Sequence, residues 1–303
     1  MSIPSGETLP KLGQNLVSQL VELFSKHPEL RPAPTKGILL SGTFTPTPEA
    51  ATLSTAPQFN DNPSTPIMVR FSSSTGIPQI DTDPNANPRA FALRFDSGDG
   101  VNDIVGHSAP GFPVHTPAEY FAFLRAIADS PPGAVSPTPV EQFLGSHPAA
   151  LAYVQLPKPP PTSYATEAYF SAAAFKFTNA QGVVKFGRYI ITPDAGLSHL
   201  DEGEIASKTT SYHRDELYER IAKGPISFTL RAQIAANGDV TNNATVRWPQ
   251  DRPVIELGKL TLQGVVPGDD AQLTFDPIPH VQGIESSGDP LLELRHLRPR
   301  SRK

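Results

Sequence analysis

Short segments of apolar, β-branched and aromatic residues fill both ends of this 303-residue sequence, and they constrain the fold more than any other feature. Runs of this kind, bounded by turn residues, predict β-strands. The 34 Pro and 22 Gly are spread along the chain without a low-complexity period, which favours a globular, loop-rich protein. The segments are residues 37–46 (GILLSGTFTP), 66–74 (PIMVRFSSS), 89–98 (RAFALRFDSG), 174–192 (AFKFTNAQGVVKFGRYIIT), 226–242 (ISFTLRAQIAANGDVTN) and 254–264 (VIELGKLTLQG).

The middle of the sequence has a helical character instead. Thr116 and Thr138 are each followed by a proline and, at the third position, by a glutamate, which is the capping box with proline in the first turn. Together with the segment AALAYVQL, these signals predict a helical insertion over residues 116–156. The run of prolines over residues 156–164 predicts an extended linker after it.

Two more helices are expected outside the insertion. Leucines at helical spacing predict an amphipathic helix over about residues 10–26, and HRDELYERIAKGP predicts a helix that ends at Gly224 and Pro225. Asn237-Gly238 is a hairpin signal. Strands, then helices, then strands, without a βαβ alternation, predict an α+β protein built around an antiparallel barrel, as a single domain over residues 1–303.

Composition excludes several classes of function. The net charge of −5 gives no general attraction to nucleic acid or to an anionic membrane, and the absence of Cys excludes disulfides and thiolate chemistry. No apolar run approaches the roughly 20 residues that span a bilayer, and no secretory signal opens the chain, so a cytoplasmic protein is expected.

Common motifs of nucleotide-binding proteins and hydrolases are missing. The sequence has no P-loop, no GxGxxG after a strand, no HExxH and no GxSxG. Its eight His residues lie without metal-ligand spacing, so no metal site is expected.

Seven segments, in order along nearly the whole chain, resemble the heme catalase superfamily and especially its small catalase-related peroxidase branch. The resemblance implies an eight-stranded antiparallel β-barrel with helical insertions, and a heme held against one mouth of the barrel. The segments are residues 69–76 (VRFSSSTG), 81–95 (DTDPNANPRAFALRF), 102–114 (NDIVGHSAPGFPV), 174–182 (AFKFTNAQG), 224–239 (GPISFTLRAQIAANGD), 248–262 (WPQDRPVIELGKLTL) and 275–295 (FDPIPHVQGIESSGDPLLELR).

The resemblance fails at the two residues on which the family chemistry depends. The distal histidine belongs to a segment like R-x-x-H-A-K-G, and here Arg31 is followed by Pro34 at the histidine position. The proximal tyrosine comes four residues after an arginine, and here Arg295 is followed by Pro299. A proline side chain can neither coordinate iron nor transfer a proton. Peroxide dismutation by a tyrosinate-ligated heme is therefore not expected.

The remaining polar positions of the family site are candidates for another chemistry. His107 and Ser72 are the expected catalytic pair, with a satisfied strand-end hydroxyl and a structural loop histidine as alternatives. Substrate binding is expected from Phe112 as an aromatic wall and from three arginines as anion contacts, with ion pairs to Asp81–Asp83 as the alternative for the first two arginines. These arginines are Arg31, Arg70 and Arg295.

Three hypotheses follow. The first is a heme-free enzyme that transforms a small, largely apolar organic molecule by acid/base chemistry, such as isomerisation, cyclisation or dehydration. The second is a heme-dependent peroxidase with an atypical iron ligand, for which His296 is the nearest candidate. The third is a non-catalytic small-ligand-binding protein. The expected partner is a small organic molecule, and the family's oligomers are consistent with a homodimer.

Overall fold

Ten antiparallel strands form the body of the molecule. The structure is a computed structural model that describes residues 37–60, 64–73, 81–83, 87–97, 101–131, 133–267 and 273–296, with the backbone alone for residues 294–296. The strands are β1 (Ile38–Pro46), β2 (Thr65–Ser73), β3 (Arg89–Asp96), β4 (Val101–His107), β5 (Tyr169–Phe170), β6 (Phe175–Thr178), β7 (Val184–Pro193), β8 (Ile226–Ile234), β9 (Val254–Val265) and β10 (Ile284–Ser286).

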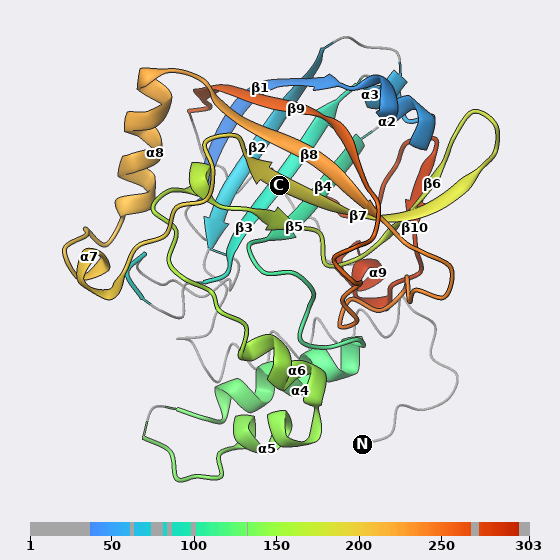
Figure 1. Ribbon diagram of the computed structural model, residues 1–303. Coiled ribbons are helices and arrows are strands. Elements are labelled where there is room, and N and C mark those ends of the chain that lie inside the picture. Colours follow the sequence, from blue (N-terminus) through green and yellow to red (C-terminus); the bar gives the residue numbers. More distant parts are fainter. Residues whose placement is uncertain are drawn as a thin grey trace.

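The sheet closes into a barrel. Its order is β10-β6-β7-β5-β4-β3-β2-β1-β9-β8, and an additional pairing of β7 with β8 joins the two sides. The eight strands from β7 through β5 and onward to β8 form the closed ring, while β6 and β10 extend it (Figure 1). The predicted fold class, an α+β protein around an eight-stranded antiparallel barrel, is confirmed.

Alternation along the strands fills the barrel interior. Phe91, Leu93 and Phe95 of β3 are at most 1% exposed, whereas the residues between them are half-buried. Since successive side chains of a strand point to opposite faces, the large apolar residues point inward and Ala90 and Ala92 point outward. The same pattern in the other strands builds one large apolar core inside the barrel.

Helices cover the barrel and form a separate lobe. The helices are α2 (Pro48–Leu53), α3 (Pro57–Asn60), α4 (Pro117–Ala128), α5 (Pro139–Ser146), α6 (Pro148–Val154), the short 3-10 helix η3 (Tyr164–Thr166), α7 (Glu202–Ala206), α8 (Tyr212–Lys223) and α9 (Pro290–His296). Helices α4, α5 and α6 make up the helical lobe, which projects below the barrel (Figure 1). The lobe has its own small core, to which Leu291 of α9 also belongs.

Both predicted capping boxes of the helical lobe are present, because the side chains of Thr116 and Thr138 accept from the backbone N–H of Glu119 and Glu141.

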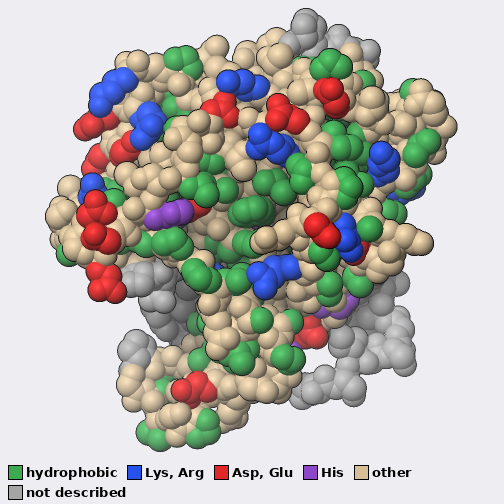
Figure 2. Space-filling model, viewed as in Figure 1, with side chains coloured by type: hydrophobic (Ala, Val, Ile, Leu, Met, Phe, Trp, Pro, Cys, Tyr) green, Lys and Arg blue, Asp and Glu red, His purple; other side chains and the backbone are tan. Residues whose placement is uncertain are grey.

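The helical lobe also differs from the barrel in its surface. Charged side chains of both signs cover the barrel, whereas apolar side chains are frequent on the lobe (Figure 2). Within the described chain, no helix combines the length and the hydropathy needed to cross a bilayer.

Two local predictions are wrong. Asn237-Gly238 forms a turn but no hairpin, since β8 pairs with β9, which starts only at Val254. Asp239, just after the turn, instead anchors an irregular loop through Arg252, whose Nε lies 2.7 Å from Asp239 Oδ2. His107, expected in a loop, is the last residue of β4. The polar residues at the start of β4 hide its strand character, although Asn102 is 1% exposed.

The backbone agrees with the predicted end of the helix before Gly224 and with the predicted extended segment over residues 156–164. Helix α8 ends at Gly224 as expected, and the prolines before η3 form an extended segment in which Pro161 bridges to His199. The predicted helix over residues 10–26 lies outside the described residues.

Candidate functional site

The two predicted catalytic residues lie in one row across three neighbouring strands. Ser72 of β2 pairs with Ala90 of β3, and Ala90 pairs in turn with His107 of β4. Neighbouring strands are about 4.8 Å apart, so the backbones of Ser72 and His107 are separated by about 10 Å, with Ala90 between them. All three residues belong to the outer face of the barrel.

A second row lies beside the first. Arg70 pairs with Ala92, and Ala92 pairs with Val105. We call the surface made by these two rows the alanine floor. Its residues are Ser72, Ala90 and His107 in the first row and Arg70, Ala92 and Val105 in the second. Methyl groups form the centre of the alanine floor, so no long side chain projects from it between the polar residues on either side. The sequence alternation of RAFALRF contains this signal, since its small residues alternate with its large ones.

Ser72 is oriented by its neighbour in the second row. Arg70 Nη1 donates to Ser72 Oγ over 2.9 Å, which leaves the hydroxyl hydrogen of Ser72 available to donate to another group. Ser72 is 3% exposed and His107 is 7% exposed, even though both belong to the outer face. Other parts of the chain therefore cover this end of the alanine floor and keep bulk water from it.

Aromatic rings form a wall beside His107. The centroid of the Phe112 ring lies 6.0 Å from that of His107, and the Tyr153 ring lies 6.3 Å away, nearly perpendicular to the imidazole. Phe112 follows β4, whereas Tyr153 comes from α6 of the helical lobe. Phe112 was predicted as an aromatic wall. Tyr153 was not, because nothing in the AALAYV segment tells which face of that helix meets the barrel.

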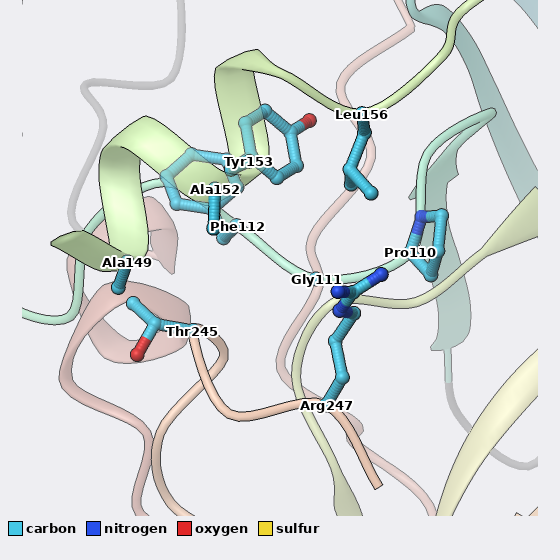
Figure 3. A pocket seen from close by; sticks show the side chains of 9 residues that line it. All are labelled: Pro110, Gly111, Phe112, Ala149, Ala152, Tyr153, Leu156, Thr245 and Arg247. Carbon is cyan, nitrogen blue, oxygen red and sulfur yellow. The ribbon is translucent and has the colours of Figure 1, made fainter. Parts of the chain in front are cut away.

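Phe112 and Tyr153 also line a small pocket (Figure 3). Its volume is about 100 Å³, enough for a few water molecules or one functional group of a larger molecule. The guanidinium of Arg247 reaches toward Gly111 at one side, opposite the apolar side chains of α6 (Figure 3). The lining residues are Pro110, Gly111, Phe112, Ala149, Ala152, Tyr153, Leu156, Thr245 and Arg247. Thr245 and Arg247 carry no sequence signal that we identified.

A buried cation holds the loop that carries Arg247. Arg188 of β7 donates to the carbonyls of Val246 and Asn243, over 2.7 and 3.2 Å. Its guanidinium carbon also lies 4.3 Å from the centroid of the Trp248 ring. Burial lowers the pKa of Arg188 to about 10, which still leaves it charged at neutral pH. The loop is therefore fixed on the barrel by cation–π and charge-assisted hydrogen bonds.

Other predicted site residues are not placed by the structure. Arg31, Pro34 and Pro299 lie outside the described residues. Arg295 lies on α9, but its side chain is also outside the described part. Among described side chains, no group of three or more His, Asp or Glu residues could hold a metal ion. The structure thus brings Ser72, Arg70, His107 and Phe112 to one end of the barrel, and it leaves the other predicted contacts as predictions.

A closed antiparallel barrel with a helical lobe beside one end is an architecture seen in solved catalases. A fungal catalase superposes with a TM-score of 0.75 at 22% identity, over 98% of this chain and 64% of the other. Catalase A from Saccharomyces cerevisiae superposes with a TM-score of 0.77 at 23% identity, over 98% and 66%. The chain thus spans about two thirds of the length of these larger proteins, and at this identity the likeness shows the fold alone.

The family follows from the sequence. The model of the family described as Catalase matches residues 24–298, so the chain belongs to the catalase family. A catalase-related peroxidase from Mycolicibacterium paratuberculosis is 33% identical over 280 residues, which are 89% of this chain and 87% of the relative. A catalase-related peroxidase from Synechococcus elongatus is 31% identical over 267 residues, with 86% and 78% covered. The predicted superfamily is therefore confirmed.

Proposed function

We propose that this chain is a catalase-family enzyme that works without heme and transforms a small, largely apolar organic molecule by acid/base chemistry. The observation that carries the proposal is the row Ser72–Ala90–His107, with a hydroxyl and an imidazole at either end of the alanine floor. Acid/base catalysis needs a group that takes a proton and a donor that stabilises the charge left behind. Sites of this kind are mostly apolar with a few placed polar groups.

The fit to heme is poor. The resemblance to heme catalases and the relatives named catalase-related peroxidases make heme the second candidate. However, Pro34 and Pro299 stand where the resemblance places the distal histidine and the proximal tyrosine. Neither proline can bind iron or move a proton. The proposed reaction therefore runs on protein side chains alone.

In this reaction the neutral imidazole of His107 takes a proton from a carbon atom next to a carbonyl group. Ser72 donates its hydroxyl hydrogen to the carbonyl oxygen, and the cation of Arg70 on Ser72 Oγ strengthens that bond as negative charge develops. The imidazolium then returns the proton to a different atom of the same molecule, so an isomerisation is balanced without a co-reactant.

The test is proton exchange into enolisable ketones and unsaturated carboxylic acids, followed by NMR in deuterated buffer. The wild-type protein should incorporate deuterium, and His107→Gln should reduce the rate by about 10² to 10⁴. Ser72→Ala should reduce it as well, whereas His280→Gln, a change at the surface, should leave it unchanged. Exchange that survives His107→Gln would show that this residue is not the base.

Absorbance separates the alternatives. Purified protein, expressed with excess heme, should show no Soret band. An intense Soret band would favour the heme peroxidase instead. Saturable binding of the same ketones or acids, without exchange into any of them, would favour the third hypothesis, a binding protein.

A further inference from the structure

One buried arginine joins the strands that carry Ser72 and His107. Arg89 is the first residue of β3, directly before Ala90 of the alanine floor, and it is fully buried. Its backbone N–H donates to Ser108 Oγ over 2.9 Å, and its carbonyl accepts from the N–H of Ser108 over 2.8 Å. Ser108 follows His107, so this reciprocal pair fixes the end of β4 against the start of β3.

The side chain of Arg89 reaches the segment that follows β2. Its Nη2 donates to the carbonyl of Asp81 over 2.8 Å, and its Nη1 lies 3.3 Å from Asp81 Oδ1. Its Nε donates to Asn87 Oδ1 over 3.0 Å. A buried guanidinium needs such partners, because an uncompensated buried charge is strongly destabilising. Asp81 therefore connects the segment after Ser72 to the strand that starts the alanine floor.

A buried histidine holds Asp81 from the opposite side. The backbone N–H of His213, in the first turn of α8, donates to Asp81 Oδ2 over 3.1 Å, and Nδ1 of the same residue lies 3.4 Å from that oxygen. Its Nε2 donates to the carbonyl of Pro161 over 3.1 Å. His213 is fully buried, so both ring nitrogens face acceptors in a site without bulk water.

The surroundings of His213 come from four parts of the chain. Asp81 precedes β3, and Arg89 is its first residue. The centroid of the His213 ring lies 4.8 Å from that of Tyr164 in η3 and 3.9 Å from that of Tyr212 in α8. The hydroxyl of Tyr212 also donates to Pro161 over 2.9 Å. These contacts leave Asp81 as the one carboxylate that His213 faces at ion-pair distance among the described residues.

We propose that His213 and Asp81 are positioning residues for the site: they hold Arg89, and Arg89 keeps Ser72 and His107 at their spacing across the alanine floor. The sequence predicts Asp81 only as an alternative ion-pair partner of Arg31 and Arg70, and it assigns His213 no role. The inference rests on the proposed function only for the roles of Ser72 and His107. The geometry of the link is independent of the reaction.

The test follows the imidazole signals of His107 by NMR in full-length protein labelled with ¹⁵N-histidine. His213→Gln keeps an N–H where Nε2 donates to Pro161 but removes the ring nitrogen beside Asp81. His213→Asn keeps an N–H beside Asp81 but loses the bond to Pro161. The matched control is His199→Gln, since His199 also lies against Pro161 but pairs with Glu167 instead of Asp81.

His213→Gln should displace the His107 signals by more than their wild-type linewidth. In His213→Asn the same signals should lie close to their wild-type positions. Asp81→Asn should give a larger displacement than either, because it removes the charge that Arg89 needs. Unchanged His107 signals in His213→Gln would overturn the proposal. If Asp81→Asn does not fold, the two His213 variants still decide. Since the readout is not turnover, failure here is distinguishable from failure of the acid/base reaction.

Discussion

At the scale of single residues, the site depends on small side chains as much as on polar ones. Ala90 separates Ser72 from His107, and Gly106 precedes His107 where β4 meets β5. A Cβ at Gly106 would lie 2.6 Å from the carbonyl oxygen of Phe170, closer than any real contact of this kind. The pairing of His107 with Phe170 is the one contact in register between these strands. Gly106 therefore allows the backbone approach that places His107.

Gly106→Ala should lower the free energy of unfolding by about 1 to 3 kcal/mol, the usual cost of overpacking a tight site. It should also weaken the proposed proton exchange, because β5 must move away from His107. Gly145→Ala in α5 is the control, since a Cβ there meets nothing within 4 Å. Chemical denaturation of both variants measures the difference. Equal stability of the two would contradict the close approach of β5.

At the scale of elements, the helical lobe has a small apolar core separate from that of the barrel. Its core is formed by a small set of side chains, and Phe143 is central among them, with Phe123 and His147 at 5.3 and 3.8 Å between ring centroids. Elements with small separate cores open at lower free energy than the main core. The lobe is thus expected to unfold locally without the barrel.

Phe143→Ala should lower the opening free energy of the lobe by about 3 to 5 kcal/mol, the range for removing a buried phenyl ring. Hydrogen exchange should speed up for amides of α5 and α6, while amides of β2 and β3 keep their wild-type rates. Val135→Ala, at a side chain that is 89% exposed, should change neither. Faster exchange in β2 and β3 as well would mean that lobe and barrel unfold together.

At the scale of the whole molecule, acid stability depends on buried titratable groups. Burial lowers the pKa of His213, and the charge of Arg89 lowers it further. Asp81 and the Pro161 carbonyl raise this pKa, but by less, so it stays below its ordinary value. An unfolded histidine titrates at about 6.5. Just below that pH the unfolded state binds more protons than the folded state, so the free energy of unfolding falls as pH decreases.

The melting temperature should therefore fall between about pH 7 and pH 5, and His213→Gln should reduce this fall. Burial raises the pKa of Glu167, which acts in the opposite sense, so the difference between variant and wild type isolates His213. For Asp81, the bonds and charges of His213 and Arg89 outweigh burial and lower the pKa. The stability that Asp81 contributes is therefore lost only at more acidic pH, as the pH falls through its lowered pKa. Parallel melting curves for variant and wild type would contradict the prediction.

Local chemistry predicted most of the elements. Capping boxes at Thr116 and Thr138 depend on residues three positions apart, so the sequence alone identified the starts of α4 and α5. The alternation in β3 is equally local and predicted the barrel strand. The Asn237-Gly238 hairpin failed because a turn signal does not determine which strand pairs with β8. That depends on β9, beyond a long loop.

The candidate site divides in the same way. The sequence by itself determined the fold class, the catalase family and the identity of Ser72 and His107 as candidates, because these follow from local patterns and ordered motifs. Only the tertiary structure placed both residues in one row on either side of Ala90, and only it joined Asp81, Arg89 and His213. Strand register and the burial of an ion pair depend on contacts between segments far apart in the chain, and such contacts leave no local signal.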